Sequence, residues 1–193
     1  MRSLELWIDL THLCNLHCRY CYTTDAEISQ SIQKQKSIDS IQADHDSKNP
    51  QSWTVNQLDK LFRQHKEMGR NFIVISGGEP TLSKDIKEIL KSAKKYELKV
   101  CLGTNGTNFN DDLSMLVSDI KLDSIQIKCD GPPEIQDYLS GEGTWVKLKK
   151  SMDNLSSQKH VPYVLGNCVL SQINKNDLEG VIKSAIELHI NTI

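Results

Sequence analysis

Short apolar runs of strand length alternate along the chain with segments of helical periodicity, and this alternation limits the possible folds most strongly. The runs are rich in apolar and β-branched residues and occupy 4–10, 72–76, 99–105, 124–130 and 164–170. Strands that alternate with helices form βα units on a parallel sheet. Both faces of such a sheet tend to be buried, in agreement with the nearly continuous apolarity of the runs. The sequence therefore predicts an α/β fold.

Five segments between and after these runs have the pattern of amphipathic helices. Thr54 and Gln57 have the spacing of a capping box. Ser83 and Asn110 are predicted to cap the next two helices, and residues 145–155 form a fourth. The fifth is predicted from an inward-facing stripe of Leu178, Val181, Ile182, Ala185 and Ile186.

Two stretches depart from the regular alternation. Residues 23–52 are polar with only sparse isoleucines, which predicts a long insertion, either partly helical or disordered. Residues 191–193 fall where a sixth strand would begin. We therefore expect the architecture to stop near the start of that strand, with no C-terminal domain for auxiliary clusters.

Charge and hydrophobicity indicate the compartment of the protein and exclude some classes of partner. The formal net charge of −2 does not suggest a basic nucleic-acid surface. No apolar run approaches the ~20 residues of a membrane span, and the N-terminus lacks the cleavage site of a signal peptide. These features predict a cytoplasmic protein that does not bind nucleic acid or membrane.

Three closely spaced cysteines, Cys14, Cys18 and Cys21, directly follow the first predicted strand. Loops after the carboxyl ends of parallel strands commonly bind ligands, and thiolates favour zinc or iron–sulfur. Structural zinc requires four ligands, and His12 or His17 is a candidate for the fourth. Three thiolates also suit a four-iron cluster with one iron open to another ligand. The other cysteines, Cys101, Cys129 and Cys168, are predicted to be buried and reduced.

The cysteine loop resembles that of the radical S-adenosylmethionine enzymes, including a peptide-modifying branch of the family. Their signature is C-x-x-x-C-x-aromatic-C, and Tyr20 supplies the aromatic residue. The resemblance extends to the ends of later strands, with the family's GGEP motif at 77–80 and its Thr-Asn-Gly at 104–106. Further matches are Asp130 and Gly131, and then Asn167 and Val169. It covers nearly the whole chain apart from 23–52.

The resemblance implies a partial TIM-like (β/α) barrel of about six βα units and a single core domain over residues 1–193. It assigns Cys14, Cys18 and Cys21 to a [4Fe–4S] cluster whose fourth iron binds S-adenosylmethionine. The residues that it assigns to S-adenosylmethionine are Tyr20, Gly77, Gly78, Glu79, Thr104, Lys128, Asp130, Asn167 and Val169. Among these, the GGEP motif is expected to bind the amino group of the methionine moiety, with Glu79 as an acceptor.

Two residues depart from the family pattern on and after the fourth strand. Lys128 stands where the family has serine, and Ser140 stands where an arginine is expected. Loss of an arginine removes a charge and a two-pronged donor. One hypothesis is that Lys128 replaces this arginine against the methionine carboxylate; the alternative is a salt bridge to Glu79 or Asp130.

The resemblance also implies a function, which is reductive cleavage of S-adenosylmethionine to a 5′-deoxyadenosyl radical. That radical would take hydrogen from a substrate that the sequence does not identify, with a peptide or protein as a candidate. The electron donor would be flavodoxin or ferredoxin, and a homo- or hetero-oligomer would cover the open sheet edge. The alternative is a non-catalytic zinc or degenerate iron–sulfur module.

Overall fold

The computed structural model of the chain describes residues 5–21 and 53–193. The predicted insertion at 23–52 lies outside the described residues. In the described part of the chain, no helix has the length and apolar character needed to cross a membrane.

A parallel sheet forms the centre of the fold, as the alternation of elements predicts. Its strands are β1 (Leu6–Asp9), β2 (Phe72–Ser76), β3 (Lys99–Thr104), β4 (Ser124–Lys128) and β5 (Tyr163–Asn167). They lie in the order β1-β2-β3-β4-β5, and each pairs in parallel with the next. The carboxyl ends of all five strands therefore lie at the same end of the sheet, where the loops that follow the strands are brought together.

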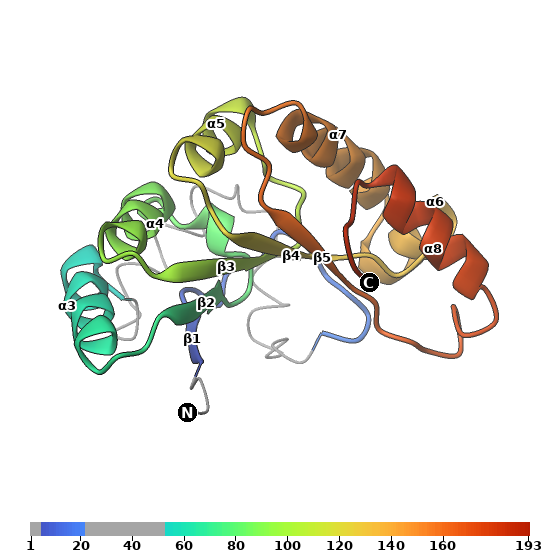
Figure 1. The fold of residues 1–193 in the computed structure, drawn as a ribbon. Coiled ribbons are helices and arrows are strands. Elements are labelled where there is room, and N and C mark those ends of the chain that lie inside the picture. Colours follow the sequence, from blue (N-terminus) through green and yellow to red (C-terminus); the bar gives the residue numbers. More distant parts are fainter. Residues whose placement is uncertain (1–4, 22–52) are drawn as a thin grey trace.

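Helices connect the strands and lie in an arc along one side of the curved sheet (Figure 1). They are α3 (Val55–Glu67), α4 (Ile86–Lys95), α5 (Asp111–Asp119), α6 (Pro133–Ser140), α7 (Thr144–Ser156) and α8 (Leu178–Glu187), with a short 3-10 turn η1 (Pro80–Leu82). This arrangement is the partial (β/α) barrel that the sequence predicts.

The hydrophobic core lies between the helices and one face of the sheet. The strand residues that it includes are Ile8, Ile73, Ile75, Val100, Leu102, Ile125, Ile127 and Val164. Side chains alternate along a strand, so the neighbouring residues point to the opposite face. On that face Trp7 of β1 is 59% exposed and Tyr163 of β5 is 49% exposed. The expected burial of both faces is therefore wrong at these two strands.

The helix caps follow the sequence predictions in two of three cases. Thr54 forms the capping box at the start of α3, and Asn110 caps α5. Ser83 does not cap α4, because it ends η1 instead and the helix begins after Asp85. Helix α6 was not predicted. It begins at Pro133, and proline is favourable at the first position of a helix because its missing N–H would be unpaired there anyway.

The last βα unit differs from the prediction in two respects. In α8, Val181 and Ala185 are buried, whereas Leu178, Ile182 and Ile186 are 50%, 52% and 70% exposed, so the predicted stripe is only partly inward. Strand β5 ends at Asn167, three residues before its predicted end.

The chain also returns to the far edge of β5, where a sixth strand was predicted to begin. Thr192 forms a parallel bridge with Leu165, and the Gly166 amide donates to the Thr192 carbonyl at 2.7 Å. An isolated bridge thus lies at the residues where the sequence places the start of a sixth strand.

Candidate cluster and cofactor site

The cysteine loop follows β1 and packs against the turn after β2. The Gly78 amide donates to the Thr11 carbonyl and the Glu79 amide to the Leu13 carbonyl, both at 2.6 Å. A Cβ atom on Gly78 would lie 2.3 Å from the Leu13 carbonyl oxygen, and one on Gly77 would lie 2.4 Å from that of Thr11. The two glycines are therefore required for the close approach of the cysteine loop.

The three cysteines of this loop are all partly exposed. Burial raises the pKa of the Cys14 thiol to about 11, so the free thiol stays protonated near neutral pH. Among the described residues, no three His, Cys, Asp or Glu side chains converge as the ligands of a single metal ion would. A four-iron cluster needs no such convergence, because each thiolate binds a different iron. Three thiolates on one loop are the kind of ligand that iron–sulfur clusters bind, so the chemistry of this donor set fits a cluster held at three corners.

Glu79 is fully buried and connects the turn after β2 to the turn after β3. Its Oε1 accepts from the Thr81 amide, the Thr81 hydroxyl and the Thr104 hydroxyl, and its Oε2 accepts from the Asn105 amide at 2.6 Å. Desolvation raises the pKa of the Glu79 carboxyl, and these donors oppose the rise. The carboxylate thus holds the GGEP and Thr-Asn-Gly turns together.

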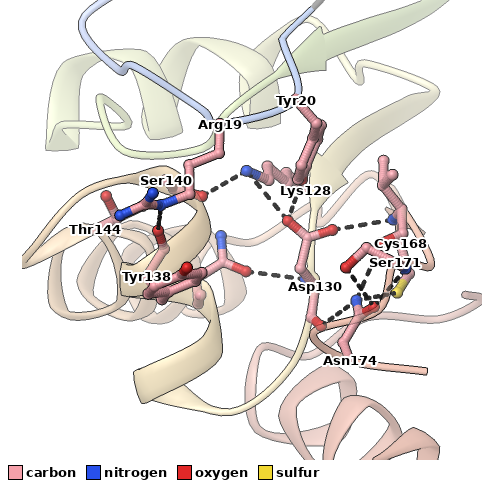
Figure 2. Close-up of polar contacts among 12 residues, drawn as sticks. Arg19, Tyr20, Lys128, Asp130, Tyr138, Ser140, Thr144, Cys168, Ser171 and Asn174 are labelled. Carbon is pink, nitrogen blue, oxygen red and sulfur yellow. Dashed lines mark hydrogen bonds and ion pairs between the residues drawn. The ribbon is translucent and has the colours of Figure 1, made fainter. Parts of the chain in front are cut away.

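Tyr20 connects the cysteine loop to the end of β4 through Asp130, as Figure 2 shows. The Tyr20 hydroxyl donates to Asp130 Oδ2, and Lys128 Nζ lies 3.1 Å from the same oxygen. Lys128 also donates to Ser140 Oγ at 2.5 Å, and its ammonium lies 4.4 Å from the centroid of the Tyr20 ring. Burial, followed by the hydrogen bond to Asp130, raises the pKa of Tyr20. The predicted alternative, a salt bridge of Lys128 to Asp130, is therefore present.

Asp130 is itself fully buried and fixes the segment after β5. Its Oδ1 accepts from the Val169 amide at 3.0 Å, and its backbone carbonyl accepts from Asn174 Nδ2 at 2.9 Å. Its own amide donates to Gln136 Oε1 in α6 at 2.9 Å. Asp130 thus connects the cysteine loop, α6 and the segment after β5.

Two sequence predictions are wrong in this region. By strand alternation, a strand that runs to residue 170 would point Asn167 and Val169 to one face. Asn167 is instead the last residue of β5, and Val169 follows it in a loop. Cys101 and Cys129 are buried as predicted, but Cys168 is partly exposed, with its sulfur 3.7 Å from Asn174 Nδ2.

Sequence reasoning missed several polar residues that fix the loops. Arg19 donates from its amide to the Leu139 carbonyl and from Nε to the Tyr138 carbonyl, and its guanidinium stacks 4.1 Å from the centroid of the Tyr138 ring. This contact attaches the cysteine loop to α6. Asn105 belongs to the Thr-Asn-Gly motif at 104–106, but its contact with Cys14 was not predicted. The hydrogen bond from Asn174 to the Asp130 carbonyl was not predicted either.

The fold, the cysteine loop and the turns around it match a known family. The family model of the Radical SAM superfamily matches residues 8–185, and the chain belongs to this family. The cofactors of the family are a [4Fe–4S] cluster and S-adenosylmethionine, as the sequence resemblance implied.

Individual relatives agree with this assignment. The chain is 26% identical over 191 residues to the PqqA peptide cyclase of Rhizobium meliloti (strain 1021). The aligned region covers 98% of this chain but only 46% of the cyclase. It thus spans less than half the length of this relative. Among solved structures, anSMEcpe with bound AdoMet gives a TM-score of 0.71 at 20% identity, over 97% of this chain and 49% of that one. The structure of Streptococcus suis SuiB bound to precursor peptide SuiA gives a TM-score of 0.71 at 18% sequence identity. This match covers 98% of the present chain and 38% of SuiB. These structures share the fold.

Proposed function

We propose that the chain is the core of an iron–sulfur enzyme that reductively cleaves S-adenosylmethionine and modifies a peptide or protein. One observation carries the proposal: three partly exposed cysteines lie on a single loop held by the turns after β2, β3 and β4. When bound and reduced, the cluster and S-adenosylmethionine would supply a 5′-deoxyadenosyl radical that removes hydrogen from the substrate.

The residues of the chain have distinct roles in this proposal. Cys14, Cys18 and Cys21 ligate three irons, and the GGEP turn holds the amino group of the methionine moiety. The backbone of this turn is the part available to a ligand, because the Glu79 carboxylate is fully buried and already accepts several hydrogen bonds. The remaining proposed contacts to S-adenosylmethionine are Tyr20, Thr104, Lys128, Asp130, Asn167 and Val169.

Names of relatives support the choice of a peptide as substrate. One is a PqqA peptide cyclase, and a structural neighbour was solved with its precursor peptide. The electron donor is proposed to be flavodoxin or ferredoxin, because the family reaction requires one low-potential electron. We further propose that an oligomer contact covers an edge of the sheet.

The proposal predicts cleavage of S-adenosylmethionine by the reconstituted chain. Anaerobic protein with dithionite should release 5′-deoxyadenosine and methionine, which liquid chromatography with mass spectrometry would quantify. A chain in which Cys18 is replaced by alanine serves as the control and should release neither. One zinc per chain without cleavage would instead favour the alternative, a non-catalytic module.

Lys128 is proposed to contact the carboxylate of S-adenosylmethionine. The Lys128 ammonium has three N–H groups. Two of them point to Asp130 and Ser140, which leaves a third for the carboxylate of a ligand. The side chain is 14% exposed beside the cysteine loop, where a carboxylate would be only partly screened. Lys128→Ala should therefore weaken binding of S-adenosylmethionine about tenfold, as a lost charged hydrogen bond of ~1.5 kcal/mol implies.

Isothermal titration of the reconstituted protein measures this change. Lys94→Ala is the matched control, since Lys94 also pairs with an aspartate, Asp123 at 2.7 Å, and is 20% exposed. Equal affinity of the Lys128→Ala and wild-type proteins would rule out the contact.

A further inference from the structure

Asn105, in the turn after β3, has a side chain that reaches a proposed cluster ligand. Its Nδ2 lies 3.8 Å from Cys14 Sγ, within hydrogen-bond range for sulfur, and also donates to Asn15 Oδ1 at 2.8 Å. Cys14 Sγ receives a second donor, the Leu16 amide, at 3.5 Å. A carboxamide from the turn after β3 thus directs an N–H group to the first cysteine of the loop.

The orientation of this carboxamide is fixed by its neighbours. Its Oδ1 accepts from the Thr107 amide at 2.9 Å and from the Thr107 hydroxyl at 2.7 Å, so the amide nitrogen must face the other way, toward Cys14. The backbone amide of Asn105 is held by Glu79 Oε2 at 2.6 Å. The donor is therefore held in place from both ends of the residue before any cluster binds.

An N–H donor to a ligating sulfur has a predictable electrostatic effect. Reduction adds negative charge to a cluster, and part of that charge lies on its sulfurs, so a nearby donor stabilises the reduced state more than the oxidised state. Because Cys14 is partly buried, this interaction is screened less than it would be in water. Removal of the donor should make reduction harder.

We infer that Asn105 is a positioning residue that orients the Cys14 thiolate and raises the reduction potential of the cluster. This inference rests on the proposed function, since it requires a cluster on the three cysteines. It adds a residue outside the cysteine loop that adjusts how readily the cluster accepts its electron.

The test compares variants of the full chain after anaerobic reconstitution with iron and sulfide. Asn105→Ala should shift the midpoint potential, measured by a redox titration followed by electron paramagnetic resonance, to more negative values. The expected change is about tenfold in the equilibrium constant of one-electron reduction, or about 59 mV. Asn108→Ala is the control. The Asn108 carboxamide donates hydrogen bonds to the carbonyl and hydroxyl of Thr81, so its removal should leave the midpoint potential unchanged.

A second variant covers the case in which Asn105→Ala does not fold. Asn105→Asp keeps the shape and the acceptor for Thr107 but replaces the N–H group with a carboxylate, so its potential should fall below that of the wild type. Loss of the cluster from a folded Asn105→Ala chain would support the orienting role. Wild-type potentials in every folded variant would overturn the inference alone, whereas a wild-type chain without any cluster would overturn the proposed function as well.

Discussion

Replacement of Cys14, Cys18 or Cys21 by alanine is expected to abolish the iron–sulfur cluster completely. A cluster held by three protein ligands has no spare thiolate, so two remaining ligands cannot retain it. Each variant should lose the brown colour and the absorption near ~400 nm that arise from iron–sulfur charge transfer. Iron and sulfide assays after anaerobic reconstitution give the result directly, with almost no sulfide expected in the variants.

The other cysteines provide matched controls for this experiment. Cys168→Ser and Cys129→Ala should retain the cluster, because neither residue belongs to the cysteine loop. Cys129 is fully buried, so its variant is expected to lose about 1 kcal/mol of stability through the cavity that is left. A cluster that survives in any loop variant, or that is lost in both controls, would contradict the assignment of the three ligands.

Asp130→Ala is expected to lower the free energy of unfolding by about 3–5 kcal/mol, the loss typical when one partner of a buried ion pair is removed. The aspartate is fully buried. Its carboxylate accepts hydrogen bonds from the Tyr20 hydroxyl and the Val169 amide and forms an ion pair with Lys128. Truncation leaves the partly buried Lys128 ammonium without its carboxylate and removes the acceptor that connects the cysteine loop to β4.

Urea unfolding of the cluster-free chain, followed by circular dichroism, measures this loss. Asp123→Ala is the control, because Asp123 also pairs with a lysine, Lys94, but its side chain is 34% exposed. Solvent screening makes such a pair weaker, and a smaller loss is expected. If the two variants were equally stable, the central structural role of Asp130 would be wrong.

Much of the fold follows from local patterns in the sequence. The strands have one dominant signal, short apolar runs, and a parallel order follows from the helices between them. The cysteine spacing and the two glycines of the GGEP motif likewise identify the cluster loop and the turn beside it. The structure adds a physical reason for Gly77 and Gly78, which is the close packing of the loop on their backbone.

Other features depend on contacts between distant segments, and local patterns do not contain them. Asp130 is recognisable as a motif residue, but its role as a connection to Tyr20 and Val169 appears only when three loops are placed together. The hydrogen bond from Asn105 to Cys14 likewise joins the turn after β3 to the cysteine loop after β1. The outward face of α8 was missed because apolar periodicity alone does not show which side of a helix is covered.

The most direct test of the account is Mössbauer spectroscopy of the wild-type chain reconstituted with isotopically enriched iron, before and after addition of S-adenosylmethionine. We expect a [4Fe–4S] cluster in which one iron differs from the other three and changes its spectrum when S-adenosylmethionine binds. Protein that holds only zinc, or a cluster whose irons all remain unchanged by the nucleoside, would contradict the account.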